Sequence, residues 1–298
     1  MADSRVVAAR ADEHNSSVGF TELDTMSDIV FFAHANGFPS ATYGKLFAAL
    51  EPEFVVRSLP QHGHDPRFPV EDNWQSLVDE LLHHVRAQAR PVWGVGHSLG
   101  GVLHLHAALR QPALYRGVIM LDSPLLSSTD RWLIRAAKRM GLIDRLTPAG
   151  RTLGRRERFA DRASAREYFL SKALFKDFDP DCLEAYLDHG LKTDEAAEAR
   201  GGAGLRLAFD PDTEIRIYRS VPHVSPGRPA DLALPVAVIG GERSRVVLPH
   251  HGRNARRLPR GEFHRLPGGH MFPFERPLMT AQLVRELLHR WQLEGQAR

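Results

Sequence analysis

Short apolar runs alternate with helical stretches over most of this chain. The runs that predict strands are five or six residues long, and most are rich in Val, Ile, Leu and Phe: residues 29–33, 54–59, 91–95, 117–121, 234–239 and 262–266. Residues 43–50 and 74–89 instead place apolar side chains three and four positions apart, the spacing of an amphipathic helix. This alternation predicts an α/β fold, with a mainly parallel sheet and helices on both faces.

The alternation of strand and helix patterns stops in the middle of the chain. Residues 127–226 are rich in arginine and helical in spacing, and no convincing strand follows before Leu234. We therefore expect a helical cap over 127–226, inserted between the two parts of the core, residues 1–126 and 227–298. The second part ends in a helix that Pro277 begins, since proline is favoured in the first turn of a helix.

The segment Gly-His-Ser-Leu-Gly at 96–100 lies where the third apolar run meets a helical pattern. A sharp turn from strand to helix at Gly-x-Ser-x-Gly exposes the serine hydroxyl above the sheet, and the small outer residues Gly96 and Gly100 allow strand and helix to pack closely. Ser98 is therefore a candidate nucleophile. The alternative interpretation is an ordinary Ser/Gly turn.

Four short signatures occur in order along the chain. They are His-Ala-Asn-Gly at 34–37, Gln-His-Gly-His at 61–64, the Gly-x-Ser-x-Gly segment at 96–100 and Gly-Gly-His at 268–270. With these motifs the chain resembles the α/β-hydrolases from Ile29 to the C-terminus, apart from the cap. The resemblance implies an α/β-hydrolase sheet and a catalytic triad in the order nucleophile, acid, histidine. His270, which follows the last strand, fits the role of general base. The alternative is a surface histidine, one of sixteen in the chain.

The acid departs from the commonest family pattern. The turn after the post-cap strand usually carries an aspartate, but here it reads Gly-Gly-Glu-Arg-Ser-Arg, with Ser244 at the expected position. Serine cannot stabilise an imidazolium as a carboxylate does. A minority of α/β-hydrolases carry the acid one strand earlier, where this chain has Asp122. We expect Asp122 to be the acid; Glu242, or a plain turn role for Asp122, remains open.

Two backbone amides are expected to form the oxyanion hole. One belongs to Leu99, directly after the nucleophile. The resemblance assigns the other to Asn36, with Phe38 as the alternative if the loop is shifted by two residues. The loop can also be read as an ordinary Asn-Gly turn.

No cofactor and no metal are expected. His62 and His64 precede Asp65 in a pattern like a metallo-hydrolase motif, but the aspartate stands one residue early. His104 and His106 lie two apart on a predicted helix and point to different faces. The pairs at 83–84 and 250–251 are expected to be solvated. The single cysteine, Cys182, excludes an internal disulfide and gives no cysteine-based metal site.

Composition narrows the classes of protein further. With 298 residues, of which 43% are hydrophobic, the chain can bury a sizeable core. The net charge is +3 without a long basic run, so a nucleic-acid partner is not expected. No membrane span and no secretion signal are apparent in the sequence, which favours a cytoplasmic protein. The oligomeric state stays open.

The resemblance implies a serine hydrolase that cleaves a small carboxylic ester through an acyl-enzyme, with a cap that shapes an apolar pocket. The family also contains thioesterases, amidases, carbon–carbon bond hydrolases and cofactor-free perhydrolases, which these motifs do not separate. Serine at position 98 argues against the epoxide hydrolases and dehalogenases of this fold, which use aspartate there. Two other classes stay open: a ligand receptor without turnover, because the acid is displaced, and a metal-dependent hydrolase.

Overall fold

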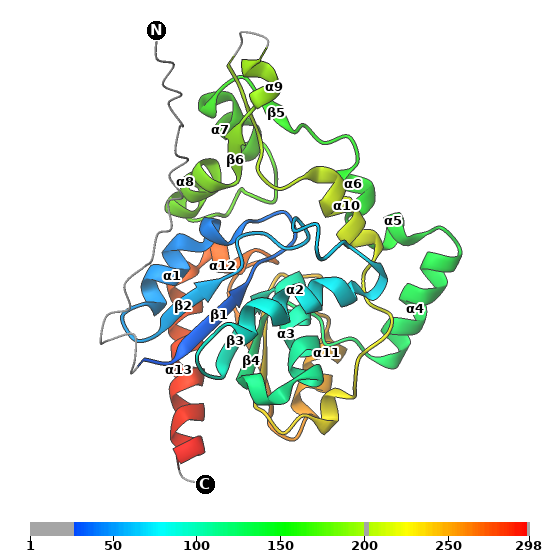
Figure 1. Cartoon of the computed structure of the whole chain (residues 1–298), viewed down its shortest axis with the longest axis vertical. Coiled ribbons are helices and arrows are strands. Elements are labelled where there is room, and N and C mark those ends of the chain that lie inside the picture. Colours follow the sequence, from blue (N-terminus) through cyan, green and yellow to red (C-terminus); the bar gives the residue numbers. More distant parts are fainter. Residues whose placement is uncertain (1–26, 200–202, 297–298) are drawn as a thin grey trace, which may run out of the picture.

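The protein is built on one six-stranded sheet, described in a computed structural model that covers residues 27–199 and 203–296. The strand order is β2-β1-β3-β4-β8-β9, and every neighbouring pair is parallel (Figure 1). The strands are β1 Ile29–Ala33, β2 Val55–Ser58, β3 Val92–His97, β4 Tyr115–Leu121, β8 Val236–Gly241 and β9 Gly261–Leu266. All six predicted strands form, with ends displaced by one or two residues, and the expected parallel sheet is confirmed.

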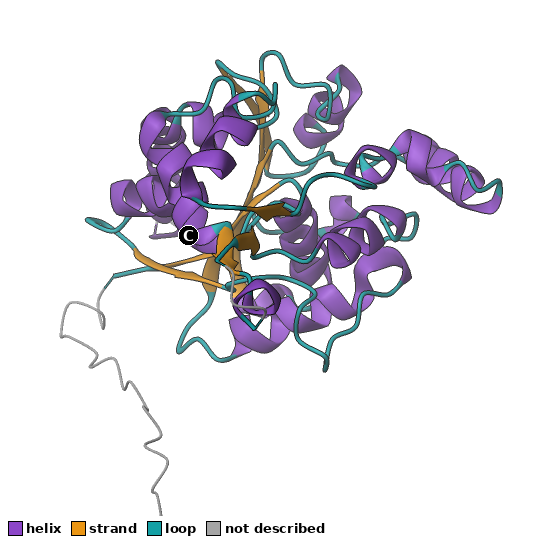
Figure 2. Cartoon of the chain, turned by 90° about the horizontal axis from the view of Figure 1, so that it is seen from above, coloured by secondary structure: helices purple, strands orange, loops and turns teal. Residues whose placement is uncertain are grey.

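Helices cover both faces of the sheet, as expected, and two hydrophobic clusters result. Val30 and Phe32 of β1 pack with α1 and α13, while Phe31, between them, packs with α2 and α3. Figure 2 shows the sheet from above, with helices on either side. The helices of the core are α1 Gly44–Leu50, α2 Gln75–Arg86, α3 Leu99–Arg110, α11 Pro249–Arg256, α12 Phe272–Glu275 and α13 Pro277–Gln296. Short 3-10 turns are η2 Ser40–Tyr43, η3 Asp72–Trp74, η4 Pro112–Leu114 and η5 Pro229–Asp231.

A long insertion separates β4 from β8. Its helices are α4 Ser128–Arg139, α5 Ile143–Leu146, α6 Ala149–Thr152, α7 Arg162–Leu170, α8 Pro180–His189, α9 Glu195–Glu198 and α10 Pro211–Arg219. It also contains a small antiparallel sheet in the order β5-β7-β6, with strands Arg158–Phe159, Leu191–Thr193 and Leu205–Leu207. The expectation that this segment holds no strand was wrong. Strands of two or three residues are too short to show an alternating pattern, and their pairing depends on distant partners.

The loops that follow the strands meet at one edge of the sheet. In a parallel sheet every carboxyl end lies at the same edge, which is where such folds place their binding sites. Cross-strand register aligns His97 with Leu121, Leu121 with Ile239 and Gly241 with Leu266, so the segments after β3, β4, β8 and β9 are neighbours. Within the described residues no helix combines the length and the apolar character that a membrane crossing requires.

Candidate active site

Ser98 lies at a strained corner between β3 and α3. Its φ of 52° and ψ of −110° are rare for a residue with a side chain and cost roughly 1–3 kcal/mol. The corner needs its glycines: a Cβ on Gly96 would lie 2.3 Å from the carbonyl carbon of Gly100, and one on Gly100 would lie 2.0 Å from the carbonyl oxygen of Ala33. The Ser98 N–H donates to the carbonyl oxygen of Leu121 at 2.9 Å, which ties the corner to the end of β4. The local geometry is thus that of a nucleophile elbow.

Asp122 and His270 meet at the same edge. Asp122 follows β4, has a φ of 43° and is fully buried. Its Oδ2 lies 2.6 Å from His270 Nδ1. Because a carboxylate only accepts, Nδ1 carries the hydrogen, and the neutral form of the ring has its lone pair on Nε2. Glu242, the other candidate acid, is exposed, and its backbone N–H donates to Leu266. Of the two carboxylates, Asp122 is therefore the one that contacts His270.

Ser244, at the position where the family usually has aspartate, also contacts Asp122. Its hydroxyl donates to Asp122 Oδ2, and Val246 N–H donates to the Ser244 oxygen at 3.0 Å. The other carboxylate oxygen, Oδ1, accepts the N–H of Gly241 at 2.8 Å. The sequence marks Ser244 as a departure from the family pattern, but no local pattern indicates its contact with Asp122. The last residue of β8 and the loop after it thus supply hydrogen-bond donors to Asp122, the residue that follows β4.

A series of buried hydrogen bonds joins the loop after β1 to the histidine loop, the segment after β9 that contains His270. The N–H of Ala35 donates to the Tyr43 hydroxyl at 3.1 Å, and that hydroxyl donates to His97 Nδ1 at 2.8 Å. His97 Nε2 in turn donates to the carbonyl oxygen of His270 at 2.9 Å. Burial holds the pKa of His97 well below its usual value, so its ring stays neutral and keeps this arrangement. Sequence reasoning missed both Tyr43 and His97, since no local pattern marks them.

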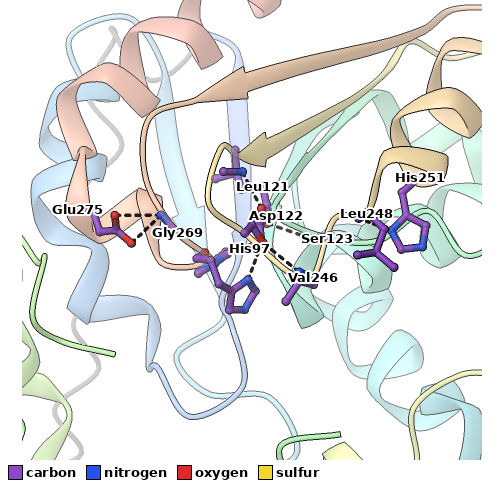
Figure 3. Close-up of polar contacts among 12 residues, drawn as sticks. His97, Leu121, Asp122, Ser123, Val246, Leu248, His251, Gly269 and Glu275 are labelled. Atoms are coloured by element: carbon purple, nitrogen blue, oxygen red, sulfur yellow. Dashed lines mark hydrogen bonds and ion pairs between the residues drawn. The ribbon is translucent and has the colours of Figure 1, made fainter. Parts of the chain in front are cut away.

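The histidine loop has a second support in Glu275 of α12. The N–H of Gly269 donates to both carboxylate oxygens of Glu275, each at 3.0 Å. Figure 3 shows the two contacts. Arg243 lies 3.1 Å from the same carboxylate, which is otherwise buried. His270 is thus held through its side chain by Asp122 and through its backbone by His97 and the Gly269 turn.

The loop after β1 contains Asn36 and Phe38, the two alternatives for the oxyanion donor that would act together with Leu99. Phe38 N–H donates to the carbonyl oxygen of Ala35 at 3.0 Å, so this amide is occupied. Within the described part of the chain, the backbone N–H groups of Asn36 and Leu99 have no acceptor. The Asn36 side chain donates to the carbonyl oxygen of Glu214 in α10 at 2.9 Å, which fixes the loop against the insertion. This pattern favours Asn36 over Phe38 as the first donor.

Sequence comparison identifies the family. The model of the Alpha/beta hydrolase family matches residues 30–283. The chain belongs to the alpha/beta hydrolase family. No curated protein sequence matches it significantly.

Solved structures share the fold of this alpha/beta hydrolase. One is E-2-(acetamidomethylene)succinate hydrolase, with 21% identity, coverage of 88% of this chain and 91% of the other, and a TM-score of 0.68. Another is the thioesterase domain from the curacin biosynthetic pathway, with 16% identity, 87% and 91% coverage and a TM-score of 0.66. An esterase of M. tuberculosis has 18% identity, 88% and 86% coverage and a TM-score of 0.63. At such identities the likeness concerns the fold alone.

The loop after β2 in this alpha/beta hydrolase contains His62, which is buried, and His64, which is half-buried. His64 donates from Nδ1 to the carbonyl oxygen of His62 at 2.9 Å and accepts at Nε2 from Asp210 N–H at 3.1 Å. Both of its nitrogens are therefore in use. His62 Nδ1 lies 3.5 Å from Glu80, and both side chains are fully buried. Burial lowers the pKa of His62 to about 3 and raises the pKa of Glu80 to about 7. The cluster fits an interior polar group better than a metal site.

The pair at 250–251 is not fully solvated, which corrects the expectation. His251 is buried because α11 packs against the core, and His250 is half-buried. Their Nε2 atoms lie 3.4 Å and 3.0 Å from the carboxylate of Asp130 at the start of α4. This trio has the composition of a metal site. However, His251 Nδ1 accepts the N–H of Leu248, so the neutral ring carries its hydrogen on Nε2 and offers Asp130 a donor instead of a lone pair. We interpret the trio as a polar contact between α4 and α11.

Proposed function

We propose that this protein is a serine hydrolase that cleaves a carboxylic ester through an acyl-enzyme, with Ser98 as nucleophile, His270 as general base and Asp122 as the acid. The observation that carries the proposal is the 2.6 Å contact between Asp122 and His270 beside the strained corner of Ser98. A receptor without turnover has no need of a buried carboxylate that orients an imidazole next to a strained serine.

In the proposed mechanism, His270 Nε2 takes the proton of Ser98 as the hydroxyl attacks the ester carbonyl. Asp122 stabilises the imidazolium that forms. The amides of Leu99 and Asn36 donate to the developing oxyanion, a contribution of a few kcal/mol for two preorganised donors. His270 then protonates the leaving alcohol, and a water activated by the same residue hydrolyses the acyl-enzyme.

The aromatic side chains beside the loop after β1 favour an apolar substrate. The ring of Phe38 packs 5.2 Å from that of Tyr186 and 5.9 Å from that of Phe175, both in the insertion. It also lies 5.2 Å from Phe274, which follows the histidine loop. Side chains of the insertion thus meet those of the core next to the site. We infer that the insertion, as a cap, shapes an apolar acyl or alcohol pocket.

A fluorophosphonate probe tests the proposal directly. We expect covalent labelling of Ser98, detected by mass spectrometry of the digested protein, and loss of labelling in Ser98→Ala. Turnover of p-nitrophenyl esters of graded chain length, with matched thioesters and amides, then separates esterase from thioesterase and amidase. EDTA treatment should leave turnover unchanged, because no step passes through a metal. Labelling at another residue, or activity restored by zinc, would contradict the assignment.

A further inference from the structure

Helix α4 carries large apolar side chains on its outward side. Trp132, Ala136 and Met140 follow one another at a spacing of four, which places them on one face of the helix. Trp132 is 66% exposed and Met140 is 63% exposed, and Leu133 beside them is 49% exposed. The opposite face already packs inward through Ile134 and Ala137. The helix is therefore apolar on two sides, and only one of them is covered.

The exposure is concentrated in this part of the molecule. Of the thirteen large apolar side chains exposed within the described residues, six lie between residues 132 and 153, including Leu142 and Leu146 next to and within α5. Figures 1 and 2 both place α4 at the periphery, projecting away from the helices of the core. Scattered apolar residues on a surface need no explanation, but a contiguous group of this kind is typical of an interaction site.

Unpaired positive charge accompanies the apolar stripe. Arg135 and Arg139 flank Trp132 and Met140, and the four line one shallow hollow together with Ala136. Within the described part of the chain, the guanidinium groups of Arg135, Arg139 and Arg145 make no ion pair. Residues 128–158 contain nine Lys or Arg against three Asp or Glu, whereas the whole chain has a net charge of only +3. Three of these nine, Lys138, Arg155 and Arg158, pair with acidic residues outside this segment. The unpaired charge beside the stripe is therefore that of Arg135, Arg139 and Arg145.

Exposed apolar side chains next to unpaired arginines favour one kind of partner for α4. A second copy of the chain docked about a two-fold axis would bring equal positive charges together, which is unfavourable. A lipid surface with anionic headgroups accepts both features: Trp, Leu and Met enter the headgroup boundary, while arginines lie along it and bind phosphates. We propose that the outward face of α4, continued by α5, docks the protein on an anionic membrane surface, parallel to the plane of the bilayer.

Vesicle flotation with the full chain tests this docking. The wild type should float with phosphatidylcholine vesicles that contain phosphatidylglycerol, and not with pure phosphatidylcholine, and the binding should fall with added salt. Arg135→Gln combined with Arg139→Gln should weaken partitioning roughly tenfold or more, since each basic residue near the surface contributes about 1 kcal/mol. Trp132→Ser should weaken it by a similar factor.

Tryptophan emission gives an independent signal. Trp74, Trp93 and Trp291 are buried, so a blue shift on vesicle binding should come from Trp132 and vanish in Trp132→Phe. As matched controls, Leu278→Ser removes a side chain of 59% exposure on α13, and Arg228→Gln removes one guanidinium whose side chain is 81% exposed. Both should float as wild type.

Three results would overturn the proposal. They are absence of flotation, equal flotation with neutral vesicles, and a dimer in sedimentation that Trp132→Ser converts to monomer, which would make a second copy the occupant. Fluorophosphonate labelling of Ser98 in solution is read separately, so failure of docking and failure of the proposed activity are distinguishable.

Discussion

At the scale of single residues, Asp122 is the side chain that receives hydrogen bonds from several segments of the site. Three donors reach its carboxylate, from His270, Gly241 and Ser244. A fully buried carboxylate is costly unless such donors satisfy it, and hydrogen bonds to a charged acceptor are the strong ones. The donors come from two separate loops, so the carboxylate fixes the position of both.

We expect Asp122→Asn to lower kcat by about four orders of magnitude while the fold is kept, because the amide cannot stabilise the imidazolium and favours the wrong tautomer. Glu242→Gln, the matched control, should change kcat less than threefold. Steady-state kinetics on one activated ester at pH 8, with circular dichroism as a check of folding, measures both. The reverse ranking would make Glu242 the acid.

A second carboxylate position follows from Ser244, whose hydroxyl already contacts Asp122. In the Asp122→Asn background, Ser244→Asp puts a carboxylate back beside His270, and we expect kcat to recover at least tenfold over Asp122→Asn alone. Arg245→Asp in the same background adds the same charge at an exposed neighbouring position and should not restore turnover. Equal recovery by both would mean that only the general charge of the loop matters.

At the scale of elements, the elbow between β3 and α3 and the turn η2 act on the site together. Tyr43, the last residue of η2, joins the backbone of Ala35 to His97, and His97 reaches the backbone of His270. The elements that carry the proposed oxyanion donor and the proposed base are thereby held in one hydrogen-bonded chain. Such a support lets a reacting group keep its geometry without touching the substrate.

Tyr43→Phe should preserve the packing of the ring and remove the hydrogen bonds that its hydroxyl makes with Ala35 and His97. We expect kcat to fall about tenfold with little change in KM, and the free energy of unfolding to fall by about 1–3 kcal/mol, because Ala35 N–H and His97 Nδ1 lose a buried partner. The control is Tyr168→Phe, whose hydroxyl makes no hydrogen bond within the described residues. Kinetics and urea denaturation measure the two effects. A stability loss without any change in kcat would reduce Tyr43 to a structural role.

At the scale of the whole molecule, the interior contains buried ionisable groups. Glu80 on α2 is fully buried, accepts the N–H of Gly63 at 2.9 Å and lies beside His62. Burial raises the pKa of Glu80 from its ordinary 4.5 to about 7. Between these values the folded protein binds more protons than the unfolded chain. The stability contributed by neutral Glu80 is therefore full at low pH and is lost as pH rises through 7.

Glu80→Gln removes this titration and keeps an acceptor for Gly63. We expect the variant to gain stability over the wild type as pH rises from 5 to 8, by up to ~3 kcal/mol. Urea denaturation at both pH values measures the difference. The pKa of His62, lowered to about 3, makes stability rise between pH 3 and 6.5, but this contribution is common to both proteins. A stability difference between Glu80→Gln and the wild type that stays the same at pH 5 and pH 8 would refute the expectation.

The sequence alone determined the features that depend on neighbours along the chain. Strand and helix periodicity is a local property, so the six strands were readable from it. The resemblance to the family was readable from four short motifs, each of at most five residues. The corner at Ser98 was readable for the same reason, since its glycines are required by contacts within a few residues of the turn and with the adjacent strand. The order of motifs marked His270 as a base, although its role remains a prediction.

The tertiary structure decided what depends on contacts between distant segments. Only the register of β4 against β8 brings Ser244 to Asp122, 122 positions earlier, and leaves Glu242 in solvent. Burial likewise separated His251 from solvent, and pairing of distant strands made β5, β6 and β7. The physical reason is the same in each case. A carboxylate, an imidazole or a two-residue strand has no local pattern that specifies its partner, so its environment is set when the layers pack.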